Sequence, residues 1–206
     1  MNEQLKLTAK YISYLFHPLV IPTLGMLIIF NSNSYVNFAI PYELKKAVII
    51  LVGLSTFIIP LIFTLLIQNR GYIDSLEMKS TKERILPYGF TIIFYFFTIY
   101  MMMKAPIPPL IFNFMIGALL SLIFAFIINF KWKISAHMIG VGGLTGALII
   151  ISIILNINLL SYITICILIS GIVASSRLIL NAHSPNQLII GFLIGMICQV
   201  FTIYFL

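Results

Sequence analysis

The chain has 206 residues, of which 61% are hydrophobic and 8% charged, and its mean hydropathy is +1.13. Soluble domains carry about 25% charged residues, so this composition excludes a water-soluble enzyme, a disordered chain and a secreted disulfide scaffold. We therefore expect one domain, residues 1–206, embedded in a membrane. Its net charge of +7 is typical of basic loops beside anionic headgroups.

Seven apolar runs approach the length of about 20 residues that a spanning helix needs. This pattern predicts an all-α membrane bundle of six to seven transmembrane helices and excludes a β-barrel. The runs cover residues 11–30, 46–67, 86–103, 109–129, 137–156, 159–179 and 187–206. Pro18 and Pro22 interrupt the first run beside His17, so it is expected to span with a kink or to lie partly in the interface.

Small residues recur at helical spacing in two of the runs. Gly142 and Gly146 form one GxxxG pair, and Gly191 and Gly195 form another. Such pairs let helix backbones approach closely inside a membrane. The two cysteines lie deep in apolar runs, with neither CxxC nor ligand spacing, and are interpreted as inert thiols.

Polar residues that can carry chemistry gather in three clusters, residues 79–87, 133–137 and 176–187. Two apolar runs separate the first cluster from the second, and two more separate the second from the third. An even number of crossings returns the chain to the same side of the membrane. The three clusters are therefore expected to meet in one site at the membrane–water interface.

The clusters are rich in cations, imidazoles and hydroxyls and poor in acids, which favours a phosphate site. Arg84 and Arg177 can bind phosphate oxygens in pairs. Of the two histidines, His137 and His183, one can attack phosphorus while the other protonates the leaving oxygen. The lack of clustered carboxylates argues against a two-metal mechanism.

The third cluster resembles the third motif of the type 2 phosphatidic acid phosphatase superfamily of membrane lipid phosphatases. That motif reads Ser-Arg, five residues, His, three residues, Asp. Ser176, Arg177 and His183 match it, whereas Gln187 replaces the Asp. Glycines four and eight residues past the acid, also typical of the family, are present here.

The second and first motifs of the family are matched in part. The second reads Pro-Ser-Gly-His, and residues 134–137 keep Ser135 and His137. The first reads Lys, six residues, Arg-Pro. Here the proline follows Arg84 by three residues, and neither Lys79 nor Lys82 has the family spacing. The resemblance covers a phosphatase-like core, about residues 79–206, and residues 1–67 supply two preceding apolar segments.

The resemblance implies a role for each matched residue. His183 would be the nucleophile that forms a phosphohistidine, and His137 the general acid. No metal and no cofactor is expected. The phosphoryl oxygens would be held by Arg177, Ser135, Ser176 and Arg84 with Lys79 or Lys82.

Gln187 has two compatible interpretations. The family's carboxylate would orient His183 and stabilise its imidazolium, whereas an amide can accept the same hydrogen bond without supplying charge, so catalysis is expected to be weaker. Residues 184–187 also read as a capping box with a proline at the first helical position. That cap would place His183 just outside a helix N-terminus, where bound anions are favoured.

Two arguments disagree about which face of the membrane carries the site. Nine cations on the site's side against three on the other predict a cytoplasmic site by the positive-inside rule. Many bacterial members of the resembled family instead place it outside the cytoplasm. Lys131 and Lys133, beside Trp132, are interpreted as an interfacial anchor, and His17 as a structural residue.

Three functions are compared. A metal-independent phosphatase in the bacterial cytoplasmic (inner) membrane, acting on a lipid phosphate or diphosphate, is the first. A catalytically weak or inactive protein that binds the same lipids is the second. A transporter is the weakest, since no ionisable residue stands at mid-membrane depth and no inverted repeat is present. The partners are the lipid substrate and the bilayer, not a nucleic acid.

Overall fold

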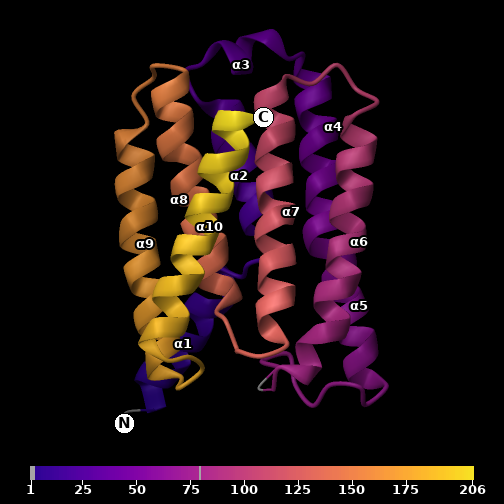
Figure 1. The fold of residues 1–206 in the computed structure, drawn as a ribbon, viewed down its shortest axis with the longest axis vertical. Helices are drawn as coiled ribbons and strands as arrows, with labels where there is room; N and C mark the ends of the chain where they lie inside the picture. Colours follow the sequence, from indigo (N-terminus) through magenta and orange to yellow (C-terminus); the bar gives the residue numbers. More distant parts are fainter. Residues whose placement is uncertain (1–2, 79) are drawn as a thin grey trace.

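The computed structural model describes residues 3–78 and 80–206, so the predicted site residue Lys79 lies outside the described residues. Every regular element in that part of the chain is helical, which confirms the all-α prediction (Figure 1). The α-helices are α1 (Glu3–Leu15), α2 (Ile21–Asn31), α3 (Tyr35–Ala39), α4 (Tyr42–Val52), α5 (Ile59–Asn69), α6 (Ile85–Met102), α7 (Pro109–Asn129), α8 (Ala136–Ile154), α9 (Leu160–Ile179) and α10 (Pro185–Phe205).

Six helical segments of the described chain are long and apolar enough to cross a membrane, which confirms an integral membrane protein. They are Tyr42–Asn69, Lys82–Met102 and the helices α7, α8, α9 and α10. Their outward surfaces carry exposed large apolar side chains such as Phe96, Leu168 and Phe201. Lipid solvates such surfaces, and helices alone satisfy the backbone there.

The span Tyr42–Asn69 consists of α4 and α5 joined by a π-helical turn, η1 (Gly53–Ile58). Pro60 explains this turn, because it lacks an N–H and its ring crowds the carbonyl four residues earlier. In the widened turn, the Ser55 hydroxyl accepts a hydrogen bond from Thr98 of α6. The irregular turn is thus fixed to a neighbouring helix.

The first apolar run is not one helix. It breaks between Leu15 and Ile21, where Pro18 and Pro22 interrupt the backbone ladder. The first half, α1, packs against α9, and the second half, α2, packs against α8 and α4. Figure 1 shows α1 at the end of the bundle that holds the N-terminus and α2 toward the opposite end. The break places His17 inside the bundle rather than on a straight helix.

The two GxxxG pairs form the closest helix contact of the bundle, between α8 and α10. A Cβ added at Gly195 would lie 2.0 Å from the Ile139 carbonyl oxygen, and one at Gly142 would lie 2.2 Å from the Phe192 carbonyl oxygen. No side chain fits at such distances. The predicted close approach is confirmed, and it brings the beginnings of α8 and α10 together.

Gly195→Ala is therefore expected to destabilise the protein. The added methyl group meets backbone, which cannot move aside as a side chain would, so we expect a loss of about 3 kcal/mol or more. Gly171→Ala on α9 is the matched control, since a Cβ there meets nothing within 4 Å. Thermal unfolding in detergent should show a lowered Tm for Gly195→Ala and an unchanged or raised Tm for Gly171→Ala; equal Tm values would contradict the packing.

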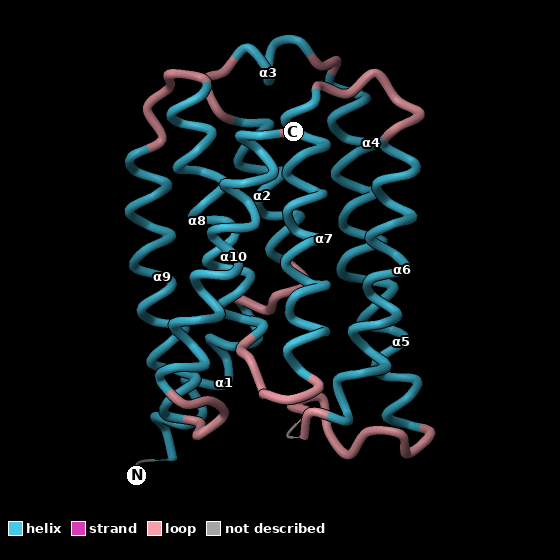
Figure 2. Tube along the Cα trace, in the orientation of Figure 1, coloured by secondary structure: helices cyan, strands magenta, loops and turns pink. Residues whose placement is uncertain are grey.

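The loops that carry the three polar clusters lie at one end of the bundle. Figure 2 shows the α5–α6, α7–α8 and α9–α10 loops, so far as the structure describes them, at the end where the chain begins, whereas the C-terminus lies at the opposite end. The loops of the three clusters thus lie at the same end of the bundle, as the even number of crossings between them predicts. The site is built at this end.

Candidate active site

A cavity of about 180 Å³ opens among the three clusters. Its wall is formed by α1 and the α1–α2 linker, α5, the loop before α6, and α6, α8, α9 and the α9–α10 loop. Four of the predicted site residues line it: Arg84, His137, Arg177 and His183. The topology thus joins, in one cavity, groups that stand up to 99 positions apart in the sequence.

His183 is buried, with 7% of its surface exposed, and it lies immediately before the N-cap of α10. Its Nδ1 lies 3.0 Å from Oε1 of Gln187, and the backbone N–H of Ser184 donates to the same oxygen at 3.2 Å. Because a backbone N–H can only donate, that atom of Gln187 is an oxygen acceptor. His183 must therefore donate from Nδ1, which leaves the lone pair on Nε2.

Burial and charge keep His183 neutral. Burial lowers the pKa of His183 from its ordinary value to about 3, and the Arg84 and Arg177 guanidinium groups add to the effect. Its hydrogen bond to Gln187 works in the opposite direction. At neutral pH the imidazole is unprotonated, the state that a nucleophile requires.

His137 is the second residue of α8, and its ring is held by the N-terminal helix. Its Nε2 lies 3.0 Å from the backbone carbonyl oxygen of Ser13, in α1. A carbonyl oxygen only accepts, so this nitrogen carries the proton. The other ring nitrogen remains for a ligand or a proton.

Two arginines provide the positive charge of the cavity. Arg84 is buried and fixed, because Nε donates to the Met78 carbonyl at 3.1 Å and Nη1 donates to the Ile134 carbonyl at 2.9 Å. Arg177 is also buried, but its Nε has no hydrogen-bond partner among the described residues. The hydroxyl of Tyr88, another cavity residue, is likewise buried without a partner there. Unsatisfied buried donors are costly, and an anion in the cavity would satisfy them.

Three of the predicted phosphate-binding residues that the structure describes, Ser135, Ser176 and Lys82, do not line the cavity. Ser135 is the N-cap of α8, and its hydroxyl oxygen accepts from the Met138 N–H. Ser176 donates to the Ile172 carbonyl one helical turn earlier. Lys82 is exposed at the start of the 3-10 helix η2 (Lys82–Arg84), and Lys79 lies outside the described residues.

Gln187 does not line the cavity either; its side chain contacts His183, which does. Its side chain completes the predicted capping box, with Ser184 accepting from the backbone of Gln187 and Oε1 accepting from the Ser184 N–H. The same oxygen orients His183. One geometry therefore contains both the predicted capping box and a hydrogen bond between Gln187 and His183.

The structure adds residues that sequence reasoning assigned elsewhere or missed. His17, interpreted as structural, lines the cavity with its ring centroid 5.5 Å from that of His137. Lys133, interpreted as an interfacial anchor, lies near the site, where burial and then Arg84 and Arg177 lower its pKa. Glu77 also lines the cavity and was not singled out. An ionisable residue inside an apolar run, as His17 is, was the available signal.

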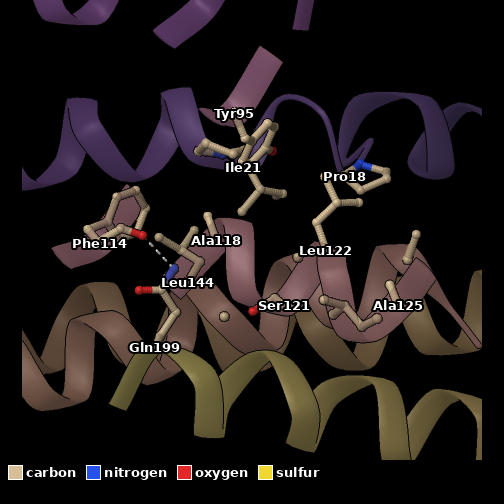
Figure 3. A pocket seen from close by; sticks show the side chains of 15 residues that line it. Pro18, Ile21, Tyr95, Phe114, Ala118, Ser121, Leu122, Ala125, Leu144 and Gln199 are labelled. Atoms are coloured by element: carbon tan, nitrogen blue, oxygen red, sulfur yellow. Dashed lines mark hydrogen bonds between the residues drawn. The ribbon is translucent and has the colours of Figure 1, made fainter. Parts of the chain in front are cut away.

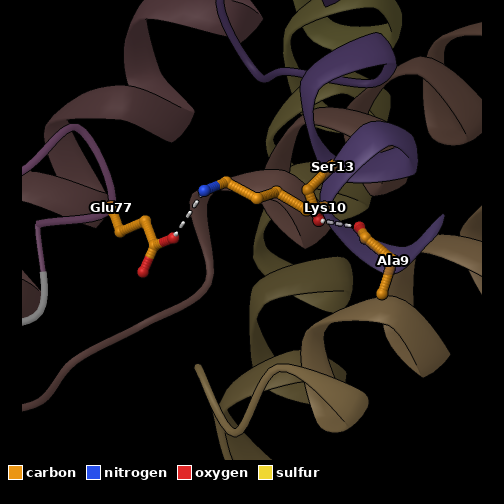
Figure 4. Close-up of polar contacts among 4 residues, drawn as sticks. All are labelled: Ala9, Lys10, Ser13 and Glu77. Carbon is orange, nitrogen blue, oxygen red and sulfur yellow. Dashed lines mark hydrogen bonds and ion pairs between the residues drawn. The ribbon is translucent and has the colours of Figure 1, made fainter. Parts of the chain in front are cut away.

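An ion pair joins α1 to the loop before α6 beside the cavity. Lys10 Nζ lies 3.7 Å from Oε1 of Glu77, and Figure 4 shows the pair bridging the two segments. Both side chains are nearly half exposed, so this pair adds only about 0–1 kcal/mol to stability. The pair matters for position, since it joins two elements that both line the cavity.

A second, smaller cavity of about 70 Å³ lies deeper in the bundle and shares Pro18 and Ala136 with the first (Figure 3). Its wall is mostly apolar. The Gln199 side chain crosses it and donates from Nε2 to the Phe114 carbonyl at 3.0 Å, which ties α10 to α7. This cavity holds none of the predicted site residues.

The donor set of the larger cavity is suited to an anion. Two guanidinium groups, a lysine nearby and imidazoles surround it, with Glu77 as its acidic member in the described chain. Within residues 3–78 and 80–206, no three His, Cys, Asp or Glu side chains are grouped as metal ligands would be. Chemically, the arrangement can hold a phosphate group against the free Nε2 of His183.

No protein-family model, curated protein or solved structure matches the chain.

Proposed function

We propose that this protein is a metal-independent membrane phosphatase that hydrolyses a lipid phosphate or diphosphate through a phosphohistidine, in the manner of the type 2 phosphatidic acid phosphatases. The observation that carries the proposal is the state of His183. Its Nδ1 donates to Gln187, so a neutral Nε2 is free beside two buried arginines. An attacking imidazole needs this combination of lone pair and neighbouring positive charge.

The reaction proceeds in two displacements. The Nε2 lone pair of His183 attacks phosphorus, the phosphorus–oxygen bond to the lipid breaks, and His137 gives a proton to the leaving oxygen. Water then attacks phosphorus while His137 takes a proton from it, the phosphorus–nitrogen bond to His183 breaks, and phosphate leaves. Arg84 and Arg177 neutralise the charge on the phosphoryl oxygens in both steps.

A lipid substrate is supported by the position of the cavity at the ends of membrane helices. The apolar residues Leu19 of the α1–α2 linker, Leu61 of α5 and Pro87 of α6 line it. A headgroup phosphate can therefore reach the arginines while its tail stays in hydrocarbon. Candidate substrates are phosphatidic acid, phosphatidylglycerol phosphate, undecaprenyl diphosphate and a lipid A phosphate, in the inner membrane of a bacterium.

The second candidate is a protein that binds lipid phosphates without turnover. The uncharged Gln187 favours it, because no carboxylate stabilises the positive charge that His183 gains on phosphorylation. The two candidates share the same cavity and the same arginines. They differ only in whether His183 reacts.

The test is phosphate release from a panel of lipid phosphates by the detergent-purified protein with a chelator present. The proposal predicts release from at least one lipid, unaffected by chelation. Inorganic phosphate that binds to a folded protein without release from any lipid would instead establish the binding function. Release that stops on chelation would contradict a metal-independent mechanism.

Arg177→Met is expected to weaken phosphate binding by about 10- to 100-fold, the value of a hydrogen bond to a charged group. Stability should not fall, because the wild-type guanidinium faces Arg84 and has a buried, unpartnered Nε. The phosphate affinity of Arg177→Lys should lie between those of the wild type and Arg177→Met, since lysine keeps the charge and loses the planar guanidinium. Titration with inorganic phosphate measures the affinities.

The matched control is Lys104→Met, an exposed cation at the other end of the bundle. It should leave phosphate affinity unchanged. If Lys104→Met and Arg177→Met weaken binding equally, the phosphate is attracted by net charge alone and not by the cavity.

A further inference from the structure

The N-terminal segment makes a hydrogen bond and a ring contact with His137. The Ser13 carbonyl of α1 accepts from Nε2 at 3.0 Å. His17, in the linker that follows, meets the same ring edge-on, with ring centroids 5.5 Å apart and planes inclined at 79°. Neither residue belongs to the three polar clusters. The expected general acid is therefore held by a part of the chain outside the phosphatase-like core.

The hydrogen-bond partners fix the tautomers of both rings. Nε2 of His137 faces a carbonyl, so it carries a hydrogen, and in the neutral ring the lone pair is on Nδ1. The backbone N–H of Leu19 donates to Nδ1 of His17 at 3.4 Å. Neutral His17 therefore carries its hydrogen on Nε2. The pair presents one donor and one acceptor beside the phosphate cavity.

We propose that α1 and its linker are a positioning element of the active site, in which the Ser13 carbonyl and His17 hold the ring of His137 so that Nδ1, not Nε2, delivers the proton to the leaving oxygen. The proposal rests on the proposed phosphatase function. The monoanionic phosphate of the bound lipid first protonates Nδ1 of neutral His137, and as the phosphorus–oxygen bond breaks this proton moves to the released lipid oxygen. The hydrogen on Nε2 stays on the Ser13 carbonyl throughout. The resulting imidazole then takes a proton at Nδ1 from the water that attacks the phosphohistidine.

An ion pair and a helix contact anchor α1 beside the cavity. Lys10 pairs with Glu77 of the loop before α6, and α1 packs along α9, the helix that carries Arg177. Orienting carbonyls hold catalytic and metal-binding histidines in one tautomer elsewhere, and loss of such partners costs about 10- to 100-fold. A comparable loss is expected when His137 can rotate.

The experiment compares two leaving groups. His17→Ala should lower kcat on a lipid phosphate by about 10-fold or more, because its alkoxide must be protonated as it leaves. On p-nitrophenyl phosphate, whose leaving group departs without protonation, kcat should change less than about 2-fold, and KM should be kept for both substrates. Tyr11→Ala, on the exposed face of α1, is the matched control and should leave both rates unchanged.

A second measurement does not depend on turnover. In full-length protein labelled with ¹⁵N in the histidine rings, the NMR shifts should show His137 with its hydrogen on Nε2. In His17→Ala the His137 signal should change toward a mixture of tautomers. A hydrogen on Nδ1 of His137, or a signal unaltered by His17→Ala, would overturn the inference.

The failures of the two proposals are distinguishable. Wild-type protein that hydrolyses no lipid phosphate contradicts the proposed function. Active wild-type protein whose His17→Ala variant loses rate equally on both substrates, or loses none, contradicts only the positioning role of α1.

Discussion

Replacement of His183 by alanine is expected to abolish turnover, lowering kcat by roughly 10⁴- to 10⁶-fold, as when other hydrolases lose their nucleophile. The proposed mechanism passes every phosphoryl group through Nε2 of this ring. The fold should survive. Gln187 Oε1 keeps its bond from the Ser184 N–H, and no charge is removed, because the low pKa of His183, about 3, keeps the ring neutral at neutral pH.

The measurement is phosphate release from the best lipid substrate, with Tm and inorganic-phosphate affinity determined on the same preparations. Arg84 and Arg177 remain in the variant, so phosphate should still bind. His137→Ala is the informative comparison, since loss of the acid should slow lipid esters more than p-nitrophenyl phosphate. Residual turnover in His183→Ala within about 10-fold of wild type would exclude His183 as the nucleophile.

Gln187→Glu is expected to raise kcat by about 10-fold, the scale on which partners of a catalytic histidine act. A carboxylate of the same length can accept from both His183 Nδ1 and the Ser184 N–H, so the capping box stays intact. Its negative charge would also stabilise the cationic phosphohistidine. Gln187→Asp restores the motif of the resembled family and should also raise the rate, although its shorter side chain is less able to reach both donors.

Gln187→Glu should also move the acid limb of the pH profile of kcat to higher pH. A carboxylate beside His183 favours the imidazolium, so its pKa rises above the wild-type value of about 3, and the neutral nucleophile is lost at a higher pH. Gln187→Met, which keeps the length and removes the acceptor, should lower kcat by about 10- to 100-fold. Equal rates for the Glu, Gln and Met proteins would show that this side chain does not orient His183.

The spans and the meeting of the clusters could be predicted because run length and the parity of crossings are properties of the sequence. The α8–α10 contact was also predictable, since Gly142 and Gly195 stand at positions where only a missing side chain allows close approach. The interruption of the first run at Pro18 and Pro22 was predicted, either as a kink in a spanning helix or as a segment partly in the interface. Its consequence was not, because the sequence does not say which elements two half-helices pack against.

The two serines show that motif spacing alone does not place a hydroxyl on the cavity wall. Ser135 and Ser176 keep the spacing of a phosphate-binding motif, but the Ser135 oxygen accepts a hydrogen bond as an N-cap, and the Ser176 hydroxyl donates to the carbonyl four residues earlier. His17 shows the opposite case. No motif marks it, and it reaches the cavity only through the tertiary packing of α1.

The most direct test of the account is to trap the covalent intermediate. Protein mixed with a lipid phosphate labelled in the phosphoryl group is quenched in alkali, in which a phosphohistidine survives, and the label is located by peptide mass spectrometry and ³¹P NMR. We expect one phosphoryl group on Nε2 of His183, absent from His183→Ala, because Nδ1 is held by Gln187. A phosphoryl group on Nδ1 or on another side chain, or release of phosphate without any labelled protein, would contradict it.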